Sequence, residues 1–452
     1  MHTNPLASWQ TWLKFVLPSL LGVWLFMTPT PWQGEVTIPV VFLAKFLVGS
    51  VEAFLVPLIV AIISLTTLAS VLVRLLQPKA LQQYFPFVYQ LLNANNLWLA
   101  IRLLGAACAL AVYFQWGPEI VWSEDTGGLL LEDLLTSLFG VFIIAGLLLP
   151  LLLNFGLLEL LGTLLSKVMR PLFGLPGRAA IDSTASWLGD GSVGILLTRK
   201  QYQQKFYTQK EAAIVGTTFS AVSLTFSLIV LTQVGLEAMF LPFYLTVCVA
   251  GIVAALIVPR LPPLRGKKQL FIDGTERTQD PDLVPAGRGL WSYGLERARI
   301  KAQSASFKQG VLVEGVKNAS EMVFAILPVI MAIGTLALVL AEGTPIFAYL
   351  GMPFVPLLEL LQIPEAAAAS QTMVVGFADM FLPAILATGI ESDMTRFVIA
   401  ALSVTQLIYM SEVGALLLGS RLPLNIAELF LIFLLRTLVT LPVIALMAHW
   451  IF

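Results

Sequence analysis

Long apolar runs recur along the chain and predict membrane-spanning helices. Each run holds about 20 residues, which is enough to cross roughly 30 Å of hydrocarbon. The first run lacks a basic segment before it and a small-residue cleavage site after it, so it is interpreted as a span and not as a signal peptide. The apolar stretch 37–50 is shorter and carries Lys45, so it is expected to form a partial or interfacial helix. About nine spans are expected, at residues 12–27, 52–76, 97–116, 135–165, 210–233, 239–258, 318–341, 395–418 and 424–450.

Two further apolar stretches are too polar and too interrupted to be continuous spans. Glycines and prolines break the first stretch, 172–198, and Gly376 and Pro383 break the second, 364–389. Backbone groups freed at such breaks must be buried in protein or line a watery cavity. Each stretch is therefore expected to form a helical hairpin that enters the membrane only part of the way.

The positions of Lys and Arg predict which side each loop faces, because cytoplasmic loops retain positive charge. The segment 77–97 is flanked by Arg74 and Arg102, whereas residues 117–133 carry five acids and no Lys or Arg. The first segment is expected in the cytoplasm together with the N-terminus, and the second outside. The expected location is the plasma (inner) membrane of a bacterium.

The two interrupted stretches are expected to enter from opposite sides. Arg170 and Arg199 flank the first stretch, which places both of its ends in the cytoplasm. The second follows the span 318–341, which starts at a basic linker and must end outside. Opposite entry predicts inverted-topology repeats, which many transporters contain. The expected fold is an all-α polytopic membrane protein with about nine transmembrane helices plus two re-entrant helical hairpins.

A polar linker divides the chain. Residues 260–317 carry eleven Lys or Arg against six acids, with prolines in their first part and a predicted amphipathic helix at about 291–316. The linker is expected in the cytoplasm. The predicted units are an N-terminal transmembrane scaffold (1–133), a first repeat (134–259) with its hairpin near 172–198, the linker (260–317), and a second, inverted repeat (318–452) with its hairpin near 364–389.

Composition agrees with membrane location and excludes several functions. Hydrophobic residues make up 58% of the chain and charged residues 12%, against about 25% charged in soluble domains. The net charge of -1 gives no basic surface for nucleic acid. Cys108 and Cys248 lie inside apolar runs and are expected to be free thiols. With only His2 and His449 and no phosphate-binding loop, neither an enzyme, a metal site nor a resident cofactor is expected.

Polar residues inside the apolar segments are candidates for function, because they are costly in hydrocarbon. They cluster in each interrupted stretch and in the span that follows it. Substrate-binding candidates are Asp182, Ser183, Thr184, Asp190, Ser192, Gln371, Thr372, Asp379, Gln406, Glu412 and Arg436, and ion-coupling candidates are Thr217, Ser220, Ser223 and Thr405.

Each candidate has a structural alternative. Membrane Ser and Thr often bond to their own helix. Asp182 has the alternative of capping a helix that begins at Ser183, and Asp190 that of a turn acid before Gly191. Asp379 and Glu412 lie in apolar surroundings without a helix start beside them, which favours function or an ion pair.

Arg436 lies near the middle of the last span, too far from either end to reach the interface. It requires a partner. Asp379 or Glu412 is the expected partner in a structural ion pair, and the alternative is that Arg436 receives a substrate carboxylate.

The stretches IDSTASWLGDGSVGILLTRKQY and YTQKEAAIVGTTFSAVSLTFSLIV resemble the YjiH family, whose members carry the Gate, or nucleoside-recognition, domain. That domain is similar to repeats in concentrative nucleoside transporters and in the ferrous-iron permease. The resemblance implies paired Gate repeats and a transport-like role, with Gln371, Gln406 and Glu412 in contexts comparable to the nucleoside carriers. The iron-permease signature is incomplete, because neither hairpin contains Cys.

Gradient-driven transport of a small polar solute is the expected function, with Na+ or H+ as coupling ion. Two substrate classes remain, nucleosides or nucleobases on the family resemblance, and amino acids, peptides or other carboxylates on Arg436. The alternative is a nontransporting membrane scaffold or signalling partner whose linker docks a cytosolic protein. The lipid bilayer is an expected partner, and a homo-oligomer is left open.

Overall fold

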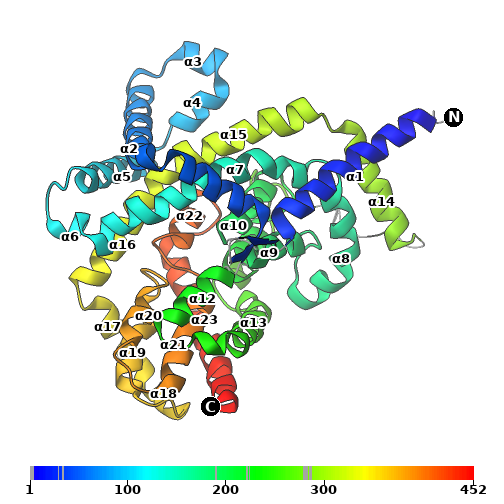
Figure 1. Ribbon diagram of the computed structural model, residues 1–452. Helices are drawn as coiled ribbons and strands as arrows, with labels where there is room; N and C mark the ends of the chain where they lie inside the picture. Colours follow the sequence, from blue (N-terminus) through cyan, green and yellow to red (C-terminus); the bar gives the residue numbers. More distant parts are fainter. Residues whose placement is uncertain are drawn as a thin grey trace.

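The computed structural model describes residues 5–28, 30–32, 35–188, 191–219, 222, 224–277, 284 and 288–452 (Figure 1). Helices dominate, and among the described residues the one sheet is a two-stranded antiparallel pair that places Pro31 opposite Val36. Six described helical segments are long and apolar enough to cross a membrane, which confirms the all-α polytopic class. They are Pro39–Leu76 (α2), Asn96–Tyr113 (α5), Glu119–Leu153 (α6, η1 and α7), Phe240–Arg260 (α13 and η4), Lys308–Gly343 (η6, α15, η7 and α16) and Ile426–Ile451 (α23).

The remaining elements are shorter or less apolar. The partial helix expected at 37–50 is wrong, because residues 39–50 form the first part of the continuous helix α2 and Thr37 ends β2. These elements are α1 (Pro5–Met27), β1 (Thr30–Trp32), β2 (Glu35–Thr37), α3 (Lys79–Tyr84), α4 (Pro86–Leu92), α8 (Leu157–Phe173), α9 (Ala179–Leu188), α10 (Gly191–Gln203), α11 (Gln209–Ile214), η2 (Val215–Phe219), α12 (Leu224–Gln233), η3 (Glu237–Met239), η5 (Leu264–Gly266), α14 (Leu290–Ser304), α17 (Ile346–Gly351), η8 (Met352–Phe354), α18 (Val355–Leu360), α19 (Ala366–Val375), α20 (Leu382–Ala387), α21 (Asp393–Gln406) and α22 (Val413–Gly419).

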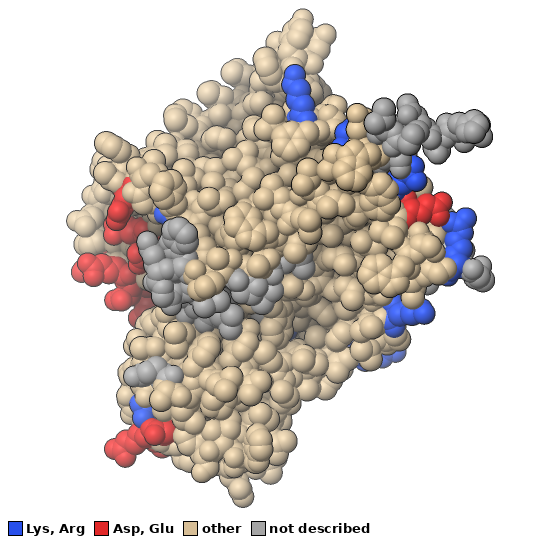
Figure 2. All heavy atoms as spheres, turned by 45° about the vertical axis from the view of Figure 1, so that its right-hand side comes forward, with Lys and Arg blue, Asp and Glu red and all other residues tan. Residues whose placement is uncertain are grey.

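The surface is what a lipid environment requires. Figure 2 shows a broad face with few charged residues, with Asp and Glu gathered at one edge and most Lys and Arg near the opposite edge. Large apolar side chains are exposed on the outer helices, for example Phe46 at 78% and Phe54 at 74% on α2. In water this exposure would be costly, whereas lipid tails cover it without penalty.

The run expected as one span at 135–165 is divided into α7 and α8. Gly156 adopts a left-handed conformation with φ of +104°, and a Cβ there would lie 2.4 Å from the carbonyl oxygen of Ala298. The Asn154 side chain donates at 2.9 Å to the carbonyl of Gly310 and at 2.9 Å to Glu314. The chain turns at this break, so that α8 lies in contact with α14, and the Asn154 side chain supplies a donor to a backbone carbonyl of the following segment.

The two halves use the same order of elements and make matching contacts. A pair of short helices, a broken span and a long helix follow one another as α9 to α13 in the first half and as α19 to α23 in the second. Helix α10 of the first pair contacts α22 of the second half, and α20 of the second pair contacts α12 of the first. The closing helices α13 and α23 contact each other (Figure 1).

The described first part of the linker, residues 261–277, consists of turns, one short 3₁₀ helix (η5, Leu264–Gly266) and an isolated β-bridge between Leu270 and Glu276, so it holds little regular structure, as its prolines predict. Phe271 N donates to Thr275 O at 2.9 Å across a turn at Gly274, and Lys205 pairs with Asp273 at 2.5 Å. The Lys205 ammonium and Thr275 hold the pKa of Asp273 well below its usual value. A lowered carboxyl pKa means that this contact is present at neutral pH and is lost only as the pH falls through the lowered value. The amphipathic helix expected at 291–316 ends at Ser304, and a new helix begins at Lys308. Pro281 and Pro285 lie outside the described residues.

Close packing of α7 on α15 depends on two glycines. A Cβ on Gly315 would lie 2.5 Å from the carbonyl oxygen of Leu147, and one on Gly146 would lie 2.7 Å from the Cα of Ala319. Small residues at such crossings let helix backbones approach closely in membranes.

We expect Gly315→Ala to lower the free energy of unfolding by about 1–3 kcal/mol, because the new methyl group forces the backbones of α7 and α15 apart. The matched control is Gly49→Ala on α2, where a Cβ meets nothing within 4 Å. That change should be neutral or stabilising. Thermal unfolding of the two variants in the same detergent measures the difference, and equal stability would contradict the packing described.

Candidate functional site

Both spans that follow the short helix pairs are broken, and neither is the continuous helix expected at 210–233 or 395–418. In the first half η2 ends at Phe219 and α12 begins at Leu224, and Val222 between them is not helical. In the second half α21 ends at Gln406, Leu407 takes a left-handed φ of +65°, and α22 begins at Val413. Backbone groups at these breaks need partners outside their own helix.

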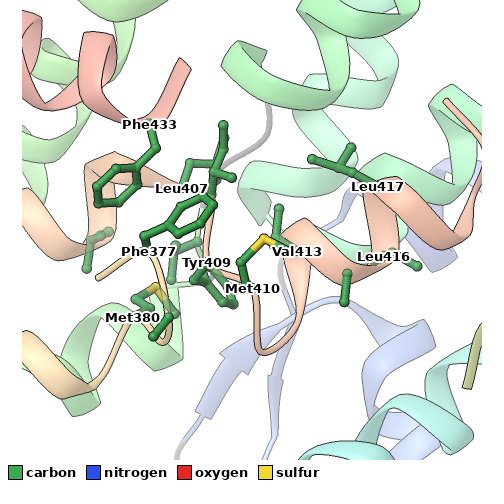
Figure 3. Packing of buried hydrophobic residues seen from close by; sticks show 14 of the residues in the cluster. Phe377, Met380, Leu407, Tyr409, Met410, Val413, Leu416, Leu417 and Phe433 are labelled. Atoms are coloured by element: carbon green, nitrogen blue, oxygen red, sulfur yellow. The ribbon is translucent and has the colours of Figure 1, made fainter. Parts of the chain in front are cut away.

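In the second half, the break is paired with the loop between α19 and α20. We call residues 376–381 the tip and residues 407–412 the second break. Met410 N donates to Phe377 O at 2.7 Å, and Ser411 N donates to Ala378 O at 2.9 Å. Figure 3 shows the two segments side by side, with Phe377 and Met380 from the tip packed beside Tyr409 and Met410 from the break. The tip thus satisfies backbone that the break exposes.

Asp379 fixes this junction. Its carboxylate accepts a hydrogen bond from the Ser411 hydroxyl at 2.6 Å and one from the backbone N–H of Phe381 at 2.7 Å. It therefore joins the second break to the start of α20 and satisfies backbone there. Glu412 lies directly before α22, so a helix start does lie beside it, and the Tyr409 hydroxyl donates to it at 3.3 Å.

Arg436 joins the two broken spans. Its Nε and Nη2 donate to the carbonyl oxygen of Thr405 at 2.9 and 2.6 Å, near the end of α21. Its Nη1 donates to the carbonyl oxygens of Thr217 and Thr218 at 3.2 and 3.4 Å, near the end of η2. The carboxyl ends of helices carry partial negative charge, so a cation is stabilised there. The expected ion pair with Asp379 or Glu412 is wrong, because among the described residues Arg436 donates to these carbonyls.

The threonines at these ends contribute their carbonyl groups. The Thr217 hydroxyl donates to Ala213 O at 2.7 Å, and the Thr405 hydroxyl donates to Ala401 O at 2.9 Å. Both hydroxyls therefore bond within their own helices, as membrane threonines often do. The carbonyls of the same residues hold Arg436. Ser220 and Ser223, the other ion-coupling candidates, lie outside the described residues.

Gln406, the last residue of α21, reaches the second helix pair. Its Nε2 donates to Met373 O at 2.7 Å and to the Thr437 hydroxyl at 2.9 Å. Its Oε1 is buried and has no hydrogen-bond partner among the described residues. A Cβ on Gly376 would lie 2.4 Å from that oxygen, so only glycine leaves room for it at the start of the tip.

Asp182 lies in another cluster, in the first turn of α9. It accepts hydrogen bonds from Gln201 at 2.6 Å, Tyr207 at 2.9 Å and Thr198 at 3.1 Å, and it is 1% exposed. Two of these donors lie on α10, so the carboxylate closes the first helix pair. Its predicted alternative, a helix cap at Ser183, is wrong because α9 already begins at Ala179.

The other candidates are placed singly. Ser183, Thr184 and Thr372 each bond to a carbonyl of their own helix, and Gln371 is exposed on α19. Ser192 is buried at the start of α10, and Asp190 lies outside the described residues. At the end of η2, Trp187 Nε1 donates to Phe219 O at 3.2 Å, so the first helix pair also bonds to the end of its broken span.

Sequence reasoning missed two groups. Thr437 on α23 was not singled out, although it follows Arg436 directly in an apolar span. Glu211 was also missed. It closes a capping box with Thr208 and pairs with Arg170 at 2.9 Å and Arg277 at 2.7 Å. The pattern Thr-x-x-Glu before an apolar run was the available signal.

We expect Arg436→Gln to lower the free energy of unfolding by about 2–4 kcal/mol, because each buried carbonyl left without a donor costs about 1–3 kcal/mol. Arg436→Lys keeps the charge but lacks the planar fork that reaches two helix ends, so its stability should be intermediate.

The control for these variants is Arg288→Gln, which removes an exposed pair with Glu296 whose side chains are both 54% exposed. That change should cost less than about 1 kcal/mol. Thermal unfolding in lipid nanodiscs compares the three, and an Arg436→Gln protein as stable as the control would rule out the tie between the two spans.

Comparison with known proteins identifies part of the chain. Residues 135–237 match the Gate family, described as nucleoside recognition, which confirms the resemblance to Gate proteins in the first half. A protein of Alkalihalophilus pseudofirmus, described as uncharacterized, is 47% identical over 437 residues, which cover 97% of this chain and 94% of that protein. No solved structure matches the chain. The protein therefore belongs to the same family as the A. pseudofirmus protein, and it is a helical membrane protein with a Gate domain.

Proposed function

We propose that the protein is a secondary transporter that moves a small polar solute across the membrane through a site between its two halves. The site consists of the tip 376–381, the second break 407–412 and, in the first half, the end of η2 that Arg436 contacts. The observation that carries the proposal is the pairing of two broken spans by Arg436, because broken helices beside a cavity are how transporters place backbone groups at the membrane midplane.

We propose that the helix pairs α9–α10 and α19–α20 are re-entrant hairpins of an inverted repeat. The reciprocal contacts of α10 with α22 and of α20 with α12 support a twofold relation between the halves. Arg170 precedes the first pair and Arg199 lies near the end of α10, and the second pair follows a helix that starts at the basic linker, which supports entry from opposite faces.

The substrate that we favour is a nucleoside or nucleobase. Arg436 uses its donors on helix carbonyls, so it is already occupied and a carboxylate substrate would have to displace those bonds. The buried Oε1 of Gln406 has no donor among the described residues and is able to accept a hydrogen bond, which suits a solute that offers N–H groups. The Gate match supports the same class. We assign coupling to Na+ or H+ at the carboxylates Asp190, Asp379 and Glu412.

Uptake into proteoliposomes tests this function. We expect accumulation of a nucleoside or nucleobase that depends on an imposed Na+ or proton gradient. Asp379→Asn should lower the uptake rate at least about tenfold and weaken the ion dependence, because a coupling carboxylate must carry charge. Glu296→Gln, an exposed change on α14, is the control and should not alter uptake. Unchanged uptake and ion dependence in Asp190→Asn, Asp379→Asn and Glu412→Gln would place the site elsewhere.

Ligand-dependent thermal stabilisation separates the remaining classes. The purified protein is heated with nucleosides, amino acids and dipeptides, each with and without Na+. A ligand at about 100 times its Kd should add about 2.7 kcal/mol to the stability of the folded state. Stabilisation by amino acids alone would favour the carboxylate class, and no stabilisation by any solute would favour a nontransporting scaffold.

A further inference from the structure

The first part of the linker contacts the starts of two helices, α11 and α23. We call residues 261–277 the strap. The strap follows α13 and contacts the start of α11, which leads into the first broken span, and the start of α23, which carries Arg436. Inside the protein, Arg436 of α23 bonds to η2, which continues directly from α11.

At α11 the strap supplies acceptors that the helix lacks. The first N–H groups of a helix have no partner within it. Gln209 N donates to Leu270 O at 2.8 Å, and Lys210 N donates to Lys268 O at 3.1 Å, so strap carbonyls satisfy two of them. Arg277 of the strap also donates two hydrogen bonds to the Glu211 carboxylate, at 2.7 and 2.8 Å.

Glu211 has two tasks at once. It accepts a hydrogen bond from the backbone N–H of Thr208 at 2.9 Å, which closes the capping box that begins α11. It is 4% exposed, so its charge depends on these partners.

The start of α23 repeats the arrangement. Asn425 and Glu428 form a second capping box, with bonds of 3.0 and 2.9 Å between backbone N–H groups and side chains. The strap's Lys267 pairs with Glu428 at 2.7 Å and donates to Pro423 O. The capping glutamates of two helices from different halves are thus both paired with cations of one short segment, and Glu211 is paired with Arg170 of α8 as well.

We propose that the strap is a releasable clamp, sensitive to ionic strength, that holds the starts of α11 and α23 together. When the strap is released, Arg436 still joins α23 to the first broken span, which α11 begins. The Lys267 and Glu428 side chains are 15% and 23% exposed, so this partly exposed pair is the end of the clamp that salt screens more, whereas the Arg277–Glu211 pair is more deeply buried. The Debye length falls from about 10 Å at 0.1 M salt to about 3 Å at 1 M, so the attraction between partly exposed charges weakens as salt is added. The proposal is independent of the transported solute.

Hydrogen exchange of the full-length protein in nanodiscs tests the clamp. The variants are Lys267→Gln, Arg277→Gln and the double variant, and the control is Arg288→Gln on an exposed pair. We expect exchange at 208–214 and 425–430 to rise about tenfold in the double variant, because local opening sets the exchange rate. Raising NaCl from about 0.1 M to about 1 M should raise exchange at 425–430 in the unchanged protein and leave 208–214 less affected, because the Arg277 and Glu211 side chains are only 13% and 6% exposed.

The control variant should exchange as the unchanged protein does, and the exchange of α5 and α16 should stay constant throughout. Lys267→Arg keeps the charge and should retain protection at 425–430, which separates loss of the ion pair from damage to the fold. Exchange that is unchanged in both the double variant and high salt would overturn the clamp. An equal rise along the whole chain would also overturn it, since that is global destabilisation.

Discussion

The guanidinium of Arg436 is buried where two helices of different halves end inside the protein. A cation in such a place requires hydrogen-bond acceptors, and helix carboxyl ends require donors, so each side of the interaction satisfies a cost imposed by the other. The carbonyl of Thr405 lies near the end of α21, and those of Thr217 and Thr218 lie near the end of η2. Arg436 therefore holds the two broken spans together from a position between their ends.

The rest of the site follows from the same need to satisfy backbone groups. Once α21 stops at Gln406, the chain up to Glu412 needs partners, and the tip supplies them through the carbonyls of Phe377 and Ala378. Asp379 and Ser411 lock the two segments together. On the proposed function, a solute would enter between segments already fixed in place, so its binding would cost little ordering of the protein.

Sequence patterns predicted the class of fold and the positions of both helix pairs, because hydropathy and Gly or Pro interruptions are local signals. They failed where the partner is distant. Apolar runs gave no sign that the spans at 210–233 and 395–418 break, since Leu407 looks like any membrane leucine. Arg436 was singled out as a residue that requires a partner, but its acceptors are backbone carbonyls 31 and 218 or 219 positions away, which no side-chain pattern records.

The inverted relation of the two halves is the central claim, and labelling of single cysteines from each side of the membrane tests it most directly. In a protein with Cys108→Ser and Cys248→Ser, cysteines replace Leu172 and Gln203 near the two ends of the first pair, and Leu360 and Gly389 near those of the second, all exposed positions. A membrane-impermeant reagent should reach the first two only from the cytoplasmic side and the last two only from outside. Labelling of the two ends of one pair from opposite sides, or of all four from the same side, would contradict the account.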